Sequence, residues 1–307
     1  MHPRSGAPRP DRDGAMTAQT VSRFAPSPTG KLHLGHAFSA IQAHDRARSD
    51  GGTFLLRIED IDGTRSRPEH VAAIEADLRW LGLHWDGAVL FQSTRLDAYA
   101  LALDRLRGED LLYPCFCTRA EIAASLSAPH GPGTVYPGTC RHMDDAARTA
   151  RIADGAQHAW RIDMAEAVTR TGPLDWHDER AGRVVTRPET HGDVVLARKD
   201  APASYHLAVT VDDAAQGVTH VVRGLDLFGA TDVHRLLQAL LDLPTPVYHH
   251  HALLHDADGL RLAKRTHAPT LERLRLAGED GIALARTLRS GQVPSDIVTT
   301  GFLVPNA

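Results

Sequence analysis

Two histidines in the segment His33-Leu34-Gly35-His36 have the clearest chemical potential in this 307-residue chain. They follow a stiff loop, Pro26-Ser27-Pro28-Thr29-Gly30, and stand where a helix is expected to begin. The start of a helix carries unpaired N–H groups and a partial positive charge, so it attracts phosphate. Gly35 lets a flat base or ribose approach the backbone closely. The combined pattern predicts a nucleotide site, whereas the histidines alone would more often be surface residues.

A second candidate for phosphate binding is the basic loop Gly259-Leu260-Arg261-Leu262-Ala263-Lys264-Arg265. Only three of the 34 basic residues are lysines, and Lys264 is one of them. A lysine ammonium is a compact charge on a flexible stem, which suits contact with a phosphate that moves during a reaction. On these residues alone, a solvated basic turn remains the alternative.

Charged residues also stand where strands are expected to end. The β-type run FLLRIED ends in Glu59 and Asp60. Ligands of an open parallel sheet bind at the carboxyl ends of its strands, where a carboxylate can hold an ammonium group. Arg23 and Arg223 can bind carboxylates there, and Tyr205 offers a hydroxyl, so the set suits an acidic amino acid. The alternative is a salt-bridge cluster of Glu59, Asp60 and Asp62 with Arg65 and Arg67.

The cysteines of the chain all lie between positions 115 and 140, as Cys115, Cys117 and Cys140. Three cysteines cannot form a disulfide framework, so the cluster indicates a reducing, cytoplasmic compartment and a zinc site. Zinc takes four ligands, and its chemistry favours a histidine as the fourth. The candidates for this fourth position are His130, Tyr136 and His142. The alternative is three reduced structural cysteines.

Alternating strand and helix patterns are expected to position these residues. Val71, Ile74, Leu78 and Leu81 follow helical spacing after one strand pattern, and a similar helix pattern follows the next. This alternation predicts an α/β fold with a parallel sheet. The formal charge of −4 provides no global basic field, so any contact with nucleic acid must be a local patch. No apolar run is long enough to span a membrane.

Four segments in this order resemble class I aminoacyl-tRNA synthetases of the glutamate type: RFAPSPTGKLHLGH, RIEDIDGTRS, SYHLAVTVDDAAQGVTHVVRGLDL and RLAKR. HLGH resembles the His-Ile-Gly-His signature of that family. RLAKR resembles Lys-Met-Ser-Lys-Ser in part, with Lys264 as the second lysine and with Arg261 and Ala263 replacing the first lysine and the serine. The resemblance implies an α/β catalytic domain with a Rossmann-like, doubly wound parallel sheet. It also implies a ligase that binds ATP with Mg²⁺ through His33, Gly35, His36 and Lys264, with His33, His36 and Lys264 as catalytic residues.

The same resemblance implies a pocket for L-glutamate. In it, Glu59 takes the α-ammonium group and Arg223 faces the side-chain carboxylate. The P-S-P-T loop resembles the glutamate branch of the family more than the glutamine branch, where P-E-P-N-G is usual. The implied pocket residues are Arg23, Phe24, Ala25, Pro26, Ser27, Glu59, Tyr205 and Arg223.

The cysteine segment, YPCFCTRAE followed by YPGTCR, resembles the zinc module of glutamyl-queuosine tRNA(Asp) synthetases, a short branch of this family. This resemblance implies one structural zinc ion on Cys115, Cys117, Tyr136 and Cys140. The chain after Lys264 is too short for a large anticodon-reading domain, as in that branch. The implied function is ATP-dependent activation of L-glutamate to glutamyl-adenylate without tRNA. Glutamate then passes to the queuosine base in the anticodon of tRNA(Asp), and the enzyme is expected to be a monomer.

Three other functions stay open at this point. One is a non-catalytic synthetase-like binding protein, which the altered RLAKR loop favours. A second is a shortened glutamyl-tRNA synthetase that acts on another acceptor. The third is a different H-x-G-H nucleotidyltransferase, which would lack the RIED and RGLDL segments.

The composition and the resemblance divide the chain into five segments. Residues 1–20 are expected to form a disordered extension, with Met16 as an alternative start. Residues 21–112 and 201–252 are expected to be the two halves of the catalytic domain. Residues 113–200 are expected to form an insertion that holds the zinc module (115–140), short strands and an acceptor-binding-like subdomain. The signature loop and a tail with two short helices follow in 253–307.

Overall fold

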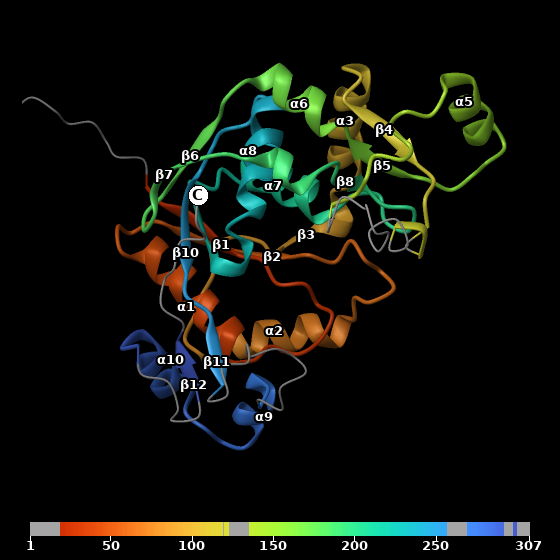
Figure 1. Ribbon diagram of the computed structural model, residues 1–307. Coiled ribbons are helices and arrows are strands. Elements are labelled where there is room, and N and C mark those ends of the chain that lie inside the picture. The colour runs from red at the N-terminus through yellow and green to blue at the C-terminus, as the bar shows by residue number, and fades with distance from the viewer. Residues whose placement is uncertain (1–18, 119, 123–134, 257–268, 292–296, 300–307) are drawn as a thin grey trace, which may run out of the picture.

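The computed structural model describes residues 19–118, 120–122, 135–256, 269–291 and 297–299 (Figure 1). Its parallel strands are β1 (Val21–Phe24), β2 (Thr53–Ile58), β3 (Leu90–Phe91), β9 (His220–Gly224) and β10 (Val247–His251). They form two parallel groups, β1-β2-β3 and β9-β10. The Thr219 N–H donates to the Val21 carbonyl oxygen (3.0 Å), so β9 lies beside β1. The two groups therefore adjoin, with β1 and β9 at the centre.

Helices cover both faces of this sheet. They are α1 (Leu34–Arg48), α2 (Pro68–Trp80), α3 (Leu96–Gly108), α7 (Tyr205–Ala215) and α8 (Ala230–Leu240), with the 3₁₀ turns η1 (Gln92–Thr94) and η3 (Leu225–Leu227). In Figure 1, α1 and α2 lie below the sheet, and α7 and α8 lie above it. One apolar core joins α1 and α2 to β1 and β2, and a second joins α3, α7 and α8. The predicted Rossmann-like, doubly wound α/β fold is confirmed.

The first helix, α1, packs close to the sheet because its inner face is built from small residues. Ala37, Ala40, Ala43 and Ala47 are all buried. The helix ends at Arg48, and Gly51 and Gly52 follow it. Gly51 there adopts a φ of +70°, which glycine reaches without the strain of a side chain. This packing places the start of α1 at the carboxyl end of β1.

The segment between α3 and α7 forms a second, antiparallel sheet in the order β4-β5-β8. The predicted short strands are present in it. Its elements are β4 (Leu112–Cys115), α5 (Asp145–Ala153), β5 (Ala159–Ile162), α6 (Met164–Thr171), β6 (Asp175–Asp178), β7 (Gly182–Val185), η2 (Pro188–His191) and β8 (Val195–Ala197). The β6-β7 hairpin does not belong to the β4-β5-β8 sheet, because β6 pairs in parallel with β10 of the main sheet. One part of the segment thus extends the main sheet.

The last described part of the chain packs below the main sheet. Its elements are β11 (Leu254–Asp256), α9 (Leu271–Leu276), α10 (Gly281–Arg289) and β12 (Ile297–Thr299). The two predicted tail helices are present, and β11 pairs with β12, a strand that the sequence pattern did not indicate. Arg289 of α10 contacts Asp45 of α1 through two hydrogen bonds (2.7 and 2.9 Å). None of the described helices is long and apolar enough to cross a bilayer.

Candidate active site

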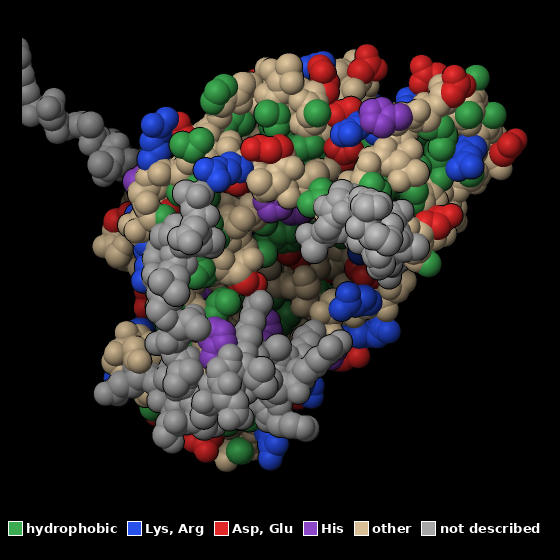
Figure 2. Space-filling model, in the orientation of Figure 1, with side chains coloured by type: hydrophobic (Ala, Val, Ile, Leu, Met, Phe, Trp, Pro, Cys, Tyr) green, Lys and Arg blue, Asp and Glu red, His purple; other side chains and the backbone are tan. Residues whose placement is uncertain are grey.

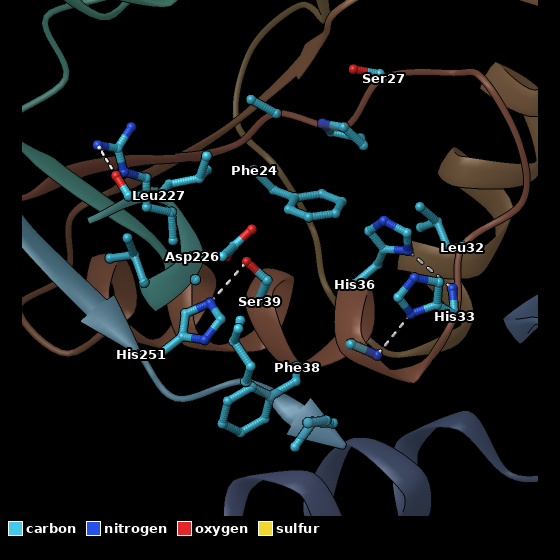
Figure 3. Close-up of a pocket in the computed structure, with 18 of the residues that line it drawn as sticks. Phe24, Ser27, Leu32, His33, His36, Phe38, Ser39, Asp226, Leu227 and His251 are labelled. Atoms are coloured by element: carbon cyan, nitrogen blue, oxygen red, sulfur yellow. Dashed lines mark hydrogen bonds between the residues drawn. The ribbon is translucent and has the colours of Figure 1, made fainter. Parts of the chain in front are cut away.

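A cavity of about 520 Å³ lies at the carboxyl ends of β1, β2 and β9. The loop after β1, the start of α1 and the segments after β9 and β10 form its walls. Figure 2 shows this face of the molecule hollowed near its centre, with histidine side chains at the edge of the hollow. Figure 3 shows Phe24 and Ser27 on one side, His33 and His36 on a second, and Asp226 and His251 on a third. The cavity therefore lies where an open α/β sheet is expected to bind its ligand.

The first turn of α1 presents two imidazoles in fixed orientations. Nδ1 of His33 accepts a hydrogen bond from the Gly35 N–H (3.1 Å), so His33 serves as the N-cap. Nδ1 of His36 accepts the His33 N–H (3.2 Å). Because both Nδ1 atoms are acceptors, the neutral rings carry their protons on Nε2. Each ring can then donate an Nε2–H bond to an anion at the positive end of the helix.

Glu59 lines the cavity beside a buried group of arginines. The Nη2 atom of Arg57 lies 3.5 Å from its carboxylate. Burial raises the pKa of Glu59 to about 6, although Arg57 and Arg23 act to lower it. The carboxylate is thus still ionised at neutral pH, and an ammonium group in the cavity would compensate its buried charge.

Asp213 connects the two arginines of this group. It accepts a hydrogen bond from Nε of Arg23 (2.8 Å) and another from Nη1 of Arg57 (2.7 Å). Burial acts to raise its pKa, but the two guanidinium groups outweigh burial and lower the pKa of Asp213 to about 2. No sequence motif identified Asp213 or Arg57 as a site residue. The sequence does contain a partial indication of Arg57, because an arginine in the otherwise apolar run FLLRI needs a buried partner.

Arg223 is buried near the end of β9, and it donates from each of its three nitrogens. Its Nε contacts Nε2 of His250 (3.1 Å), and its Nη1 contacts Nδ1 of His234 (3.2 Å) and the hydroxyl of Tyr205 (3.4 Å). Its Nη2 donates to Thr231 Oγ1 (2.6 Å) and to the carbonyl of Leu227, which is labelled in Figure 3 (3.2 Å). Tyr205, the first residue of α7, is 37% exposed, so its side of the guanidinium faces the cavity.

The structure brings together nearly all the residues that the sequence analysis assigned to the site. The residues that line this one cavity are Arg23, Phe24, Ala25, Pro26, Ser27, His33, Gly35, His36, Glu59, Tyr205 and Arg223. Lys264 and the RLAKR loop lie outside the described residues. In the alternative interpretation, Glu59, Asp60 and Asp62 would form salt bridges with Arg65 and Arg67. The structure gives these three carboxylates other partners. Glu59 pairs with Arg57, Asp60 accepts hydrogen bonds from Ser93, and Asp62 lies 3.8 Å from Arg198.

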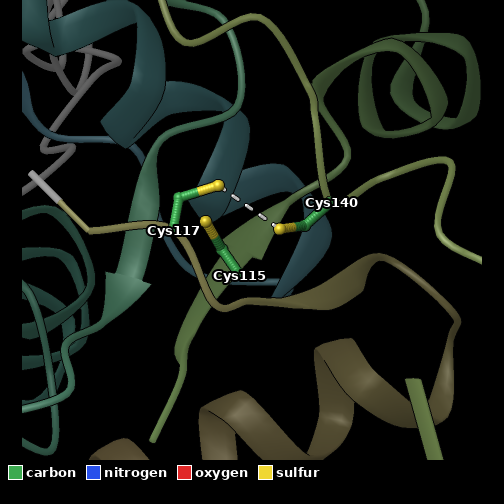
Figure 4. A group of neighbouring side chains, drawn as sticks. All are labelled: Cys115, Cys117 and Cys140. Carbon is green, nitrogen blue, oxygen red and sulfur yellow. Dashed lines mark hydrogen bonds between the residues drawn. The ribbon is translucent and has the colours of Figure 1, made fainter. Parts of the chain in front are cut away.

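The three cysteines form a second group, at the end of β4. Their sulfur atoms lie within 4.8 Å of one another (Figure 4). The hydroxyl of Tyr136 lies 3.4 Å from the sulfur of Cys115 and 3.6 Å from that of Cys117, and its oxygen accepts the Cys140 N–H (3.0 Å). Among the described residues, no histidine belongs to this group, and His130 lies outside them. Three thiols and a phenol oxygen in contact fit a four-coordinate metal ion.

Comparison with known proteins places the chain in a family. A model of the catalytic domain of class I tRNA synthetases (E and Q) matches residues 19–290. The chain belongs to this family. It is therefore a ligase of the aminoacyl-tRNA synthetase type, as the sequence resemblance indicated.

Individual relatives narrow the comparison. A protein of Rhodobacter capsulatus named Glutamyl-Q tRNA(Asp) synthetase is 51% identical over 278 residues, which cover 87% of this chain and 99% of the relative. A protein of the same name from Symbiobacterium thermophilum is 46% identical, with 83% of this chain and 81% of the relative covered. The structure of a glutamate tRNA ligase from Elizabethkingia meningosepticum, in complex with its amino acid, superposes with a TM-score of 0.70 at 27% identity. That match covers 82% of this chain and about half (54%) of the solved one.

Proposed function

We propose that this chain activates L-glutamate with ATP in the absence of tRNA and then transfers glutamate to the queuosine base in the anticodon of tRNA(Asp). One observation carries the first step: a single cavity is lined both by the phosphate-binding start of α1 and by the buried groups Glu59, Arg23 and Arg223. The names of the R. capsulatus and S. thermophilum relatives support the acceptor.

The amino acid is held by complementary charges. The Glu59 carboxylate takes the α-ammonium group, and Arg223 takes the side-chain carboxylate. Arg23 and the loop residues Phe24, Ala25, Pro26 and Ser27 border the glutamate from the end of β1. Side chains of this same chain hold both arginines in place, which supports activation without RNA and by a monomer.

The nucleotide lies against the start of α1. His33 and His36 donate from Nε2 to phosphate oxygens, and Gly35 leaves room for the ribose and base. Lys264, from the basic loop, provides a further positive charge to the phosphates, and Mg²⁺ enters with ATP as its counterion. An oxygen of the glutamate α-carboxylate attacks the α-phosphorus in line. The new P–O bond forms as the bond to the β-phosphate bridge oxygen breaks, and pyrophosphate leaves.

The second step is an acyl transfer. A hydroxyl oxygen of the queuosine base attacks the carbonyl carbon of glutamyl-adenylate, the bond from that carbon to the phosphate oxygen breaks, and AMP leaves as the hydroxyl proton passes to solvent. Positioning and electrostatic stabilisation account for catalysis of this step. No general base is required of the residues that line the cavity.

The role proposed for zinc is structural. Cys115, Cys117, Cys140 and the phenol oxygen of Tyr136 would hold the ion, and zinc would cross-link the start and end of this module. Burial raises the pKa of the Cys117 thiol to about 11, so a bound cation is needed to hold it as a thiolate at neutral pH. This reduced cluster also supports a cytoplasmic location.

The ligand set predicts the effect of two substitutions on zinc content. Cys140→Ser and Tyr136→Phe are each expected to lower the zinc measured per chain by atomic absorption, since each removes one of four ligands. His142→Ala is the control, because the described metal group contains no histidine, and it is expected to retain zinc. Unchanged zinc in both ligand variants would contradict the ligand set.

The basic loop predicts a strong effect on the first step. Lys264→Ala is expected to lower the rate of glutamate-dependent exchange of pyrophosphate into ATP by about 100-fold, because one phosphate contact in the transition state is lost. Lys199→Ala is the matched control. That lysine donates to the carbonyl oxygens of Phe116 and Cys117 (2.8 and 3.1 Å), in the cysteine module. Equal exchange rates in the two variants would contradict the assignment of Lys264 to the phosphate site.

The acceptor is tested with tRNA(Asp) whose 3′ end is blocked by a route that spares queuosine. Labelled glutamate is expected to become attached to the blocked tRNA that carries queuosine and not to the same tRNA with an unmodified base. Attachment only to tRNA with a free 3′ end would favour a glutamyl-tRNA synthetase acting on another acceptor. Binding of glutamate and ATP without any product would favour a non-catalytic binding protein.

A further inference from the structure

Two buried side chains behind Arg223, those of His250 and Asp178, have no role in the proposed chemistry. His250 contacts Arg223, and Asp178 contacts His250. We propose that Asp178 and His250 are positioning residues, which fix one tautomer of the imidazole and thereby aim the Arg223 guanidinium at the side-chain carboxylate of the substrate. This inference rests on the proposed function for the identity of that carboxylate.

The first observation is the burial and saturation of Asp178. Its side chain and that of His250 are both fully buried (0% exposed). One carboxylate oxygen lies 2.8 Å from Nδ1 of His250 and also accepts the His250 N–H (3.1 Å). The other oxygen accepts the N–H groups of Arg180 and Ala181 (2.9 Å each). Asp178 is therefore held in place as an acceptor on both oxygens.

The second observation is that the hydrogen-bond partners leave His250 only one arrangement. An ionised carboxylate only accepts, so Nδ1 of His250 must carry a proton. On the opposite side of the ring, Nε2 lies 3.1 Å from Nε of Arg223, and a guanidinium only donates. Nε2 must therefore be an unprotonated acceptor. His250 is thus neutral, with its proton on Nδ1, and burial accordingly lowers its pKa to about 4, although Asp178 acts to raise it.

A second imidazole supports the guanidinium in the same way. Nδ1 of His234 lies 3.2 Å from Nη1 of Arg223, so this atom must also be an acceptor. Nε2 of His234 then carries the proton and donates to Nδ1 of His206, 3.1 Å away. Burial lowers the pKa of His234, which agrees with a neutral ring. Both histidines that contact Arg223 are therefore uncharged acceptors.

The consequence concerns which N–H remains for the substrate. A guanidinium has five N–H groups. His250, His234, Thr231 and Leu227 receive four of them at 2.6–3.2 Å. The fifth points to the hydroxyl of Tyr205 at 3.4 Å, on the side of the cavity. A carboxylate from the substrate can take this contact without disturbing the other four.

Asp178→Asn tests the chain of bonds. The amide keeps one acceptor oxygen and replaces the other with an NH₂ donor. With its oxygen on the N–H groups of Arg180 and Ala181, the amide turns its NH₂ towards Nδ1 of His250, which favours the other tautomer of His250 and sets its Nε2–H against the Arg223 Nε–H. In glutamate-dependent pyrophosphate exchange, the KM for glutamate is expected to rise about tenfold, while the KM for ATP and kcat stay within about twofold of the wild type.

Glu179→Gln is the matched control. Glu179 is the next residue after Asp178, and its carboxylate makes the same contact with Nδ1 of His249 (2.8 Å), the histidine just before His250 and nearer to solvent. This variant is expected to leave the KM for glutamate unchanged. An Asp178→Asn enzyme with the wild-type KM, or an equal rise in both variants, would overturn the proposal.

A second pair of variants decides the case if Asp178→Asn does not fold. His250→Gln and His250→Met both remove the Nδ1–H from Asp178, but only glutamine offers Arg223 an acceptor. The glutamine variant is expected to have the lower KM for glutamate, and equal values would overturn the proposal.

The imidazole itself gives a readout that does not depend on activity. In a spectrum of the ¹⁵N-histidine-labelled chain, the signal that His250→Gln removes is expected to be that of a neutral ring protonated on Nδ1. A ring protonated on Nε2 would overturn the proposal. A wild-type chain without glutamate-dependent exchange would contradict the proposed function instead, and this spectrum would then test the hydrogen-bond chain alone.

Discussion

Glu59→Gln is expected to lower kcat/KM for glutamate in the exchange reaction by about 100-fold or more. The variant keeps the shape of the side chain but removes the negative charge that the α-ammonium group needs in a buried site. Loss of one member of a buried charge pair typically costs about 2–5 kcal/mol. Each 1.4 kcal/mol corresponds to about a factor of ten in kcat/KM, so a loss in this range agrees with the expected fall of about 100-fold or more. The KM for ATP is expected to change little, because the phosphates bind at the start of α1.

Asp60→Asn is the matched control for this variant. Asp60 is the adjacent carboxylate, but it accepts hydrogen bonds from the backbone and hydroxyl of Ser93 (2.8 and 2.7 Å) and is not among the residues that line the cavity. Its activity is expected to stay near that of the wild type. An equal loss of activity in both variants would contradict the assignment, because the loss would then come from a general disturbance of this region and not from the missing ammonium contact.

The pH dependence provides a second readout of Glu59. Because burial raises its pKa to about 6, the carboxylate becomes protonated as the pH falls through 6. The KM of the wild type for glutamate is expected to rise below this pH, and Glu59→Gln is expected to lack that rise. A wild-type KM that is constant between about pH 5 and 8 would contradict the assignment.

Asp213→Asn is expected to have the largest effect on stability. The substitution leaves the guanidinium groups of Arg23 and Arg57 without their shared negative charge, and Arg57 is completely buried. Breaking a buried ion pair by removing one partner typically costs about 3–5 kcal/mol. Urea denaturation is expected to show a fall of about 3 kcal/mol in the free energy of unfolding.

The sign of the pH effect follows from the pKa of Asp213, which is lowered from 3.8 to about 2. Its contribution to stability is present at neutral pH and is lost as the pH falls from about 4 towards 2. Asp175→Asn is the control, since the pair of Asp175 with Arg183 lies at the surface and is expected to matter little. Equal unfolding midpoints for the two variants would contradict the importance of the buried group.

The fold was largely predictable because its elements leave local patterns. The apolar spacing of Val71, Ile74 and Leu78 identified α2. Strand β12 was not predicted, because three residues leave too little pattern. The pairing of β6 with β10 depends on contact between segments about 70 residues apart, which no local pattern encodes.

The cavity was predictable where its residues belong to motifs, as His33, His36 and Glu59 do. The buried support behind the cavity was not. Asp213 and Arg57 are 156 positions apart in the sequence, and no local pattern around either residue indicates that the other is its partner. The run His249-His250-His251 shows the same limit. Alternate residues of a strand face opposite sides, so His250 is fully buried against Asp178 whereas His249 contacts Glu179 nearer to solvent, but the sequence does not say which side is which.

The most direct test of the proposed function is exchange of labelled pyrophosphate into ATP by the purified chain in the absence of any tRNA. Exchange is expected to require L-glutamate and not to be supported by L-glutamine, whose neutral amide cannot replace the side-chain carboxylate at Arg223. Exchange that occurs equally with both amino acids, or that appears with neither, would contradict the claim that glutamate and ATP react in this cavity.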